Sequence, residues 1–100
     1  MITEVAFKII LHAGNGKSKA MEAIQKAKLG QFKQAEILLE KAGEELVEAH
    51  QFQTKLLQKE ASGEQTPINL MLIHSQDHLM TAMTVRDLAR EFIELYEQIN

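Results

Sequence analysis

The sequence has no cysteine, one proline and no tryptophan. Without cysteine, neither a disulfide bond nor a thiolate metal site can form. The formal net charge is −3 and Lys and Arg form no cluster, which argues against nucleic acid and anionic membranes as partners. No apolar run approaches the roughly 20 residues of a membrane span, and Met1-Ile2-Thr3-Glu4 carries no basic targeting segment. We therefore expect a cytoplasmic protein that does not insert into a membrane.

The residues that are abundant favour helices. Ala, Leu, Glu, Lys, Gln and Met dominate, and the length suits one domain, 1–100. Start signals at Thr3 and Thr66-Pro67 and stop signals at Gly30 and Ser62-Gly63 divide the chain. The helices predicted from these signals span about 3–28, 31–61 and 67–99. The predicted fold is all-α, an antiparallel up-down-up three-helix bundle, whose modest core would benefit from oligomerisation.

The expected inner faces of the first two helices repeat every three or four residues. The first face consists of Ile2, Val5, Ile9, Ala13, Gly16, Ala20, Ile24 and Ala27, and the second of Phe32, Ala35, Leu39, Ala42, Leu46, Ala49, Gln53 and Leu56. Gly14-Asn15-Gly16 interrupts a good helix-forming sequence at a cost of about 0.5–1 kcal/mol per glycine. Two explanations stay open, a kink in the helix or the close approach of a neighbouring helix.

The segment His74-Ser75-Gln76-Asp77-His78 combines two imidazoles, a carboxylate and an amide. At helical spacing His74, Asp77 and His78 share one face. The same face continues with Thr81, Val85, Leu88, Phe92, Leu95 and Ile99. Because its second half is apolar, we predict a buried face whose polar first half lies inside a bundle.

Helix register predicts that this segment meets other polar or small residues at one height of the bundle. The predicted layer consists of His12, Gly14, Gly16, His50, Gln53, His74, Asp77 and His78. We interpret His12 and His50 as packing residues of this layer.

Three interpretations of His74 stay open. His74 and His78 could present two nitrogens to a metal and Asp77 an oxygen, although the HExxH pattern and a third nearby ligand are missing. A neutral imidazole is also a good nucleophile for phosphoryl transfer, with Ser75, Gln76 or His78 close enough to orient it or to contact the phosphoryl group. The third interpretation is a hydrogen-bonded structural histidine. Asp77 is costly in an apolar seam, unless three copies meet around a cation on a threefold axis.

The run His74–Thr81 resembles the signature of the enzyme IIA component of lactose/cellobiose-type sugar phosphotransferase systems. The resemblance covers nearly the whole chain. Further matches, in order, are Ala13–Ser18, Glu48–His50, Gln53-Thr54, Glu60–Glu64 and Ile93–Tyr96. The runs Gln53–Leu56 and Leu88–Tyr96 look closer to cellobiose and chitobiose members than to lactose members.

The resemblance implies a homotrimer of three-helix protomers, a nine-helix bundle. It implies that His74 accepts a phosphoryl group on Nε2 from the phosphocarrier protein HPr and passes it to a cysteine of enzyme IIB. Enzyme IIB serves the membrane component IIC in the uptake and phosphorylation of a β-linked disaccharide such as cellobiose, chitobiose or lactose. Asp77 is implied to bind Mg²⁺ or a similar divalent cation at the trimer axis, with no organic cofactor, and Gln76 and His78 to support the site. The alternative function is a non-enzymatic helical interaction module with a structural His/Asp layer.

Overall fold

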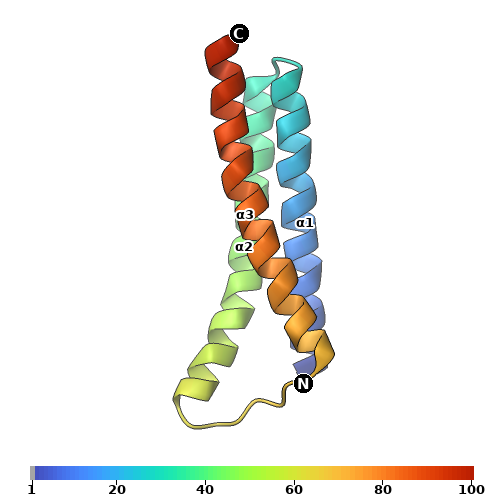
Figure 1. Ribbon diagram of the computed structural model, residues 1–100, viewed down its shortest axis with the longest axis vertical. Coiled ribbons are helices and arrows are strands. Elements are labelled where there is room, and N and C mark those ends of the chain that lie inside the picture. Colours follow the sequence, from blue (N-terminus) through green and yellow to red (C-terminus); the bar gives the residue numbers. More distant parts are fainter. Residues whose placement is uncertain (1) are drawn as a thin grey trace.

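The computed structural model describes residues 2–100, which form a bundle of three long helices. The helices are α1 (Ile2–Lys28), α2 (Phe32–Ala61) and α3 (Leu70–Ile99). In Figure 1, α1 and α3 run in the same direction and α2 runs in the opposite direction. The bundle measures 53 × 20 × 17 Å. The prediction of an all-α, up-down-up bundle is confirmed.

Glycine ends the first two helices, as expected. Gly30 has a φ of 76°, its N–H donates to Ala27 O, and Gln31 N–H donates to Lys26 O. Gly63, with a φ of 96°, makes the corresponding bonds after α2. A positive φ costs glycine little because it has no Cβ, and these paired bonds satisfy the last carbonyls of each helix.

The predicted start of the third helix is wrong by three residues. Asn69, not Thr66, is the N-cap, and its side-chain oxygen accepts a hydrogen bond from Leu72 N at 2.8 Å. Thr66 and Pro67 instead belong to the connection of residues 62–69, which spans the gap between the diverging ends of α2 and α3 (Figure 1). Thr3 likewise lies within α1 and does not cap it. Residues 62–69 stay non-helical because an extended segment reaches further across the gap than a helical one. Asn69 can then begin α3, because asparagine is at least as strong an N-cap as threonine.

The core is built mainly from small side chains. Ten of its fifteen buried hydrophobic residues are alanines, and the larger ones are Ile9, Leu39, Leu46, Leu79 and Ile93. An added Cβ at Gly16 would lie 2.8 Å from Leu46 Cδ2 and 3.2 Å from Ala42 O. Close approach of α2 therefore explains this glycine, and α1 is continuous from Ile2 to Lys28. An added Cβ at Gly14 meets no atom within 4 Å.

The predicted inner face of α3 is wrong by one residue in this chain. The buried residues are Ser75, Leu79, Ala82, Ala89 and Ile93, each next to a position predicted to be buried. His74, Asp77 and Thr81 are exposed. The large apolar residues Leu88, Phe92 and Leu95 expose between 44% and 52% of their surface. The helix has two neighbouring apolar faces, and the one with small residues packs against α1 and α2 because it allows closer contact.

Side-chain hydrogen bonds join α2 to both neighbours. Arg90 Nη1 donates to both carboxylate oxygens of Glu36, at 2.9 and 2.7 Å, and so connects α3 to α2. On the other side of α2, His12 Nδ1 lies 2.8 Å from Glu45 Oε2, and Asn15 donates to Glu45 Oε1 at 3.2 Å. The hydrogen bond with His12 is the main cause that lowers the pKa of the Glu45 carboxyl, against the opposing effect of partial burial.

The pair also changes the interpretation of His12. Its ring stacks on Phe52 with the ring centroids 6.2 Å apart, and Lys8 Nζ lies 5.4 Å from the Phe52 ring. His12 therefore belongs to a contact between α1 and α2. Glu45 was not predicted from the sequence, although its place beside the inner-face residue Leu46 was a signal that its carboxylate is not fully solvated.

Exchange of the two nearby glycines for alanine should have opposite effects on stability. In Gly16→Ala the new methyl group meets Leu46 and the Ala42 carbonyl, so we expect a loss of about 1–3 kcal/mol. Gly14→Ala, the matched control, enters open space and should gain about 0.5–1 kcal/mol from helix propensity. Urea denaturation followed by circular dichroism measures both, and equal effects of the two exchanges would contradict the close packing at Gly16.

The Glu45 carboxylate should stabilise the fold at neutral pH and not at acidic pH. Its pKa is lower in the folded than in the unfolded state, so its contribution is present above the ordinary value of 4.5 and is lost as the pH falls through the folded value. The group is partly exposed, so we expect Glu45→Gln to cost below about 1 kcal/mol at pH 7 and less at pH 3.5. Denaturation at both pH values tests this, with exposed Glu48→Gln as the charge control. A loss that is equal at both pH values would contradict the pairing.

Candidate functional site

Two imidazole rings from successive turns of α3 meet at the surface. His74 is exposed, His78 is partly buried, and their Nε2 atoms lie 3.0 Å apart. The rings meet edge to face, with centroids 4.4 Å apart. The i, i+4 spacing on a helix causes this contact, because residues four apart lie one above the other. At this distance the two Nε2 atoms can share one hydrogen bond, and the tautomer of each ring decides which nitrogen donates and which accepts.

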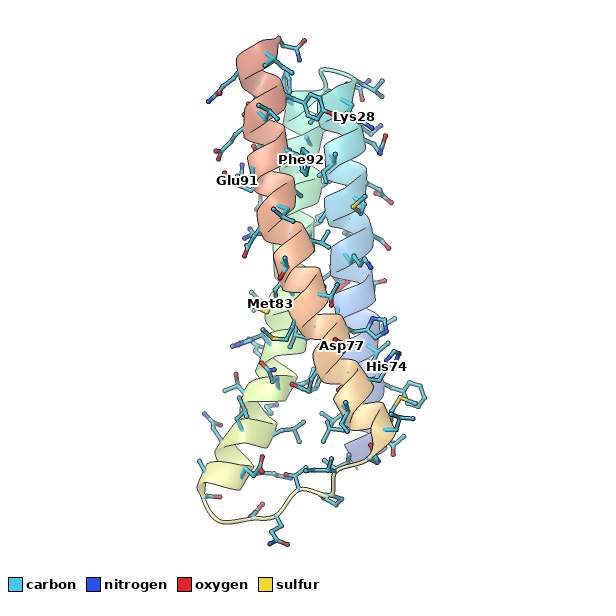
Figure 2. All side chains as sticks on the ribbon, in the orientation of Figure 1. Lys28, His74, Asp77, Met83, Glu91 and Phe92 are labelled. Carbon is cyan, nitrogen blue, oxygen red and sulfur yellow. The ribbon has the colours of Figure 1, made fainter. Side chains whose placement is uncertain are left out.

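The surface beside His74 is a shallow hollow, and Asp77 is the one acidic residue in its lining. It is lined by Leu70, Ile73, His74, Gln76, Asp77 and Met80. Figure 2 shows His74 and Asp77 in the part of α3 that lies beside α1, where α2 has diverged. The sequence has no Lys or Arg from residue 66 to 85, so the donors that the hollow offers to an anion are the His74 ring and the Gln76 amide. An incoming protein can therefore reach His74 without displacing the core.

The predicted inner face of α3 required Asp77 to be buried, but Asp77 is not buried within this chain. It is exposed on α3 between the exposed apolar residues Ile73 and Met80. In the described part of the chain, no group of three or more His, Cys, Asp or Glu residues could hold a metal ion. A single protomer thus supplies one carboxylate, and a cation here would need further ligands from other copies.

The side chain of Gln76 bonds to α2 and that of Ser75 is buried, and neither forms a hydrogen bond with the His74 ring. Gln53 Nε2 donates to Gln76 Oε1 at 2.6 Å, and Gln76 Nε2 donates to Ser75 Oγ at 3.3 Å. Ser75 is fully buried, and its hydroxyl donates to Leu72 O at 2.6 Å. The expectation that the Ser75 hydroxyl reaches a phosphoryl group on His74 is therefore wrong. Gln76 keeps one free N–H and still lines the hollow beside His74.

The predicted polar layer is wrong as one unit but partly right in register. The bond between Gln53 and Gln76 shows that these positions of α2 and α3 lie at one height. His12 instead pairs with Glu45 between α1 and α2. His50 is exposed, with Nδ1 3.5 Å from Thr54 Oγ1. The layer splits because its members occupy three different faces of the bundle.

In the described residues, no helix combines the length and apolar character needed to cross a membrane.

Comparison with known sequences gives a consistent family. A family model described as "PTS system, Lactose/Cellobiose specific IIA subunit" matches residues 4–97. The chain is 56% identical over 96 residues to the lichenan-specific phosphotransferase enzyme IIA component of Bacillus subtilis strain 168, covering 96% of this chain and 87% of that protein. It is 49% identical over 89 residues to the cellobiose-specific EIIA component of Lactococcus lactis subsp. lactis strain IL1403, covering 89% and 77%.

Solved structures agree with this assignment. The crystal structure of the cellobiose-specific enzyme IIA from Bacillus anthracis matches with a TM-score of 0.96 at 50% identity, covering 99% of this chain and 91% of that chain. The IIA(Chitobiose)–HPr complex of Escherichia coli, solved in solution, matches with a TM-score of 0.84 at 36% identity, covering 99% and 96%. The chain therefore belongs to the lactose/cellobiose-specific IIA subunits of the sugar phosphotransferase system, PTS.

Proposed function

We propose that this IIA subunit is a phosphocarrier in which His74 accepts a phosphoryl group from phospho-HPr and passes it to a cysteine of enzyme IIB. The observation that carries the proposal is the exposed His74 ring, which lines a shallow surface hollow without Lys or Arg and whose Nε2 lies 3.0 Å from Nε2 of His78. A solved relative is a complex of IIA(Chitobiose) with HPr, which supports HPr as the donor. The subunit acts in the cytoplasm and reaches the membrane component IIC through IIB.

The histidine pair suits an imidazole nucleophile. When His74 carries its proton on Nδ1, its Nε2 is the acceptor and His78 donates from its own Nε2. In the transfer, the bond between phosphorus and the donor nitrogen breaks while His74 Nε2 bonds to phosphorus. The hydrogen bond from His78 then passes from the His74 nitrogen to a phosphoryl oxygen. In the next step the thiolate of IIB attacks the same phosphorus and releases His74 as a neutral ring.

The transported sugar is proposed to be a β-linked disaccharide of the cellobiose, chitobiose or lactose type. Relatives at 41% to 56% identity are described as lichenan-, cellobiose-, galactose- and lactose-specific. The spread of these names is expected, because this subunit passes on a phosphoryl group and does not contact the sugar.

We further propose that three copies assemble around α3. The exposed apolar residues of α3 form a stripe along the helix: Leu70, Ile73, Met80, Leu88, Phe92, Leu95 and Ile99. A stripe of this size on a monomer indicates a surface that another protein covers. Parallel packing of three such stripes would form a nine-helix bundle and gather three Asp77 carboxylates at the axis. Carboxylate oxygens suit Mg²⁺ or a similar divalent cation, which would neutralise their mutual repulsion there.

His74→Gln should abolish phosphorylation, because an amide provides no nucleophilic nitrogen. We expect wild-type protein to acquire acid-labile, base-stable phosphate when it is incubated with HPr, radioactive phosphoenolpyruvate and the phosphotransferase-system enzyme that transfers the phosphoryl group from phosphoenolpyruvate to HPr, and the variant to acquire less than about 1% of it. His50→Gln, at an exposed position away from the site, is the control and should label normally. Normal labelling of His74→Gln would refute the assignment. Absence of labelling in the wild type would favour a non-enzymatic interaction module.

Asp77→Leu should leave the trimer intact or stabilise it. The exchange removes three crowded carboxylates and extends the apolar stripe between Ile73 and Met80. Sedimentation equilibrium with and without EDTA measures the association state. Wild-type trimers should weaken when EDTA removes the cation, and Asp77→Leu trimers should not. Dissociation of the variant to monomers would show that the cation is required for assembly.

A further inference from the structure

A hydrogen bond between two glutamines connects α2 to the segment of α3 that carries His74. In the described residues, two side-chain connections join these helices, the Arg90–Glu36 pair and the Gln53–Gln76 bond. The first lies in the half of the bundle where α2 and α3 are close. The second lies where they begin to diverge toward the connection 62–69 (Figure 1). The glutamine pair is therefore the last hydrogen-bonded connection between α2 and α3 before the helices separate.

The space beyond this bond is not filled by packed side chains. A cavity of about 220 Å³ lies between the helices and the connection, lined in part by Gln53, Leu56, Leu72 and Gln76. Apolar packing in this region is weak, because Leu56 and Leu72 are only partly buried. The position of the first turns of α3 relative to α2 thus depends strongly on the glutamine bond.

The bond continues through side chains on one side of His74 to the backbone oxygen of Leu72 on the other side. Gln76 continues the chain to Ser75 Oγ, and Ser75 donates to Leu72 O. The atoms held in this way belong to residues 72, 75 and 76, so His74 lies within the restrained segment. All the bonds point one way, since Gln53 donates to the Gln76 oxygen and the Gln76 nitrogen donates to Ser75.

We infer that Gln53, on α2, is a positioning residue for phosphoryl transfer at His74. It acts through Gln76, because its amide holds the Gln76 side chain against α2 and so fixes the rotation of the turn that presents the His74 ring. The inference rests on the proposed function of His74. Active groups need to be held within about 0.5 Å and 10–20° of their productive geometry, and small displacements lower the rate strongly.

Quenched-flow experiments measure the rate of phosphoryl transfer from phospho-HPr to three variants: Gln53→Leu, Gln76→Leu and the double variant. Gln53→Leu should lower kcat about tenfold and leave KM for phospho-HPr unchanged, since the docking surface is intact. Gln53→Leu should add no further loss in a Gln76→Leu background, because it acts through that residue. Gln53→Glu, which can accept but not donate, should also lower kcat. Gln58→Leu, an exposed glutamine on the same helix, is the matched control and should match the wild type.

A second readout does not depend on phosphoryl transfer. The ¹⁵N resonances of the His74 ring in the unphosphorylated protein should shift in Gln53→Leu and not in Gln58→Leu. Wild-type kcat and wild-type resonances in Gln53→Leu would overturn the inference. It would also be overturned if the fold-loss of kcat in the double variant equalled the product of the fold-losses in the two single variants. A raised KM with unchanged kcat would also overturn it, because that pattern indicates docking. Failure of wild-type protein to accept a phosphoryl group would refute the proposed function instead.

Discussion

Close packing through alanine is the constraint on which the rest of the structure depends. Most buried hydrophobic side chains are alanines, and Gly16 allows the Ala42 carbonyl and Leu46 to approach α1 directly. Such a core brings helix backbones together but removes little apolar surface per residue from water. Apart from Leu79 and Ile93, most of the large apolar residues of α3 consequently remain exposed or half-buried. Covering these exposed apolar residues in an assembly would remove further apolar surface from water and so add stability that the small core does not provide.

The same packing decides how the site is presented. Because Ser75 and Leu79 occupy the inner face of α3, His74 is turned outward and His78 lies beside it at the surface. Asp77 then lies among the exposed apolar residues of α3, and the described residues offer no group of three or more His, Cys, Asp or Glu side chains that could hold a metal ion there. The His74 ring and the exposed apolar residues of α3 thus both lie on the outer surface of one helix. Polar side chains that face α2, above all Gln76, connect the reactive turn to the rest of the bundle.

Much of the fold and of the candidate site could be read from the order of residues. Helix-forming composition and the glycines at 30 and 63 predicted three helices within a few residues of their ends. Spacing brought His74 and His78 together, since four residues make one turn and need no tertiary contact. The family resemblance, quoted on separated motifs, is confirmed by the match over residues 4–97. These features are local or are preserved in sequence, so one chain is enough to recognise them.

The sequence by itself therefore determined the helices, their ends at glycine, the imidazole pair and the family. Tertiary structure alone decided which of two adjacent apolar faces of α3 turns inward, and it chose the face of small residues. It also decided that His12 pairs with Glu45, that Gln53 reaches Gln76, and that Asn69 begins α3 across a widened gap. The physical reason is that the periodicity of apolar residues shows which face of a helix is apolar but does not show which other helix packs against that face. Rotation by a single residue leaves local helical energies unchanged, while packing distances between helices change and select one arrangement.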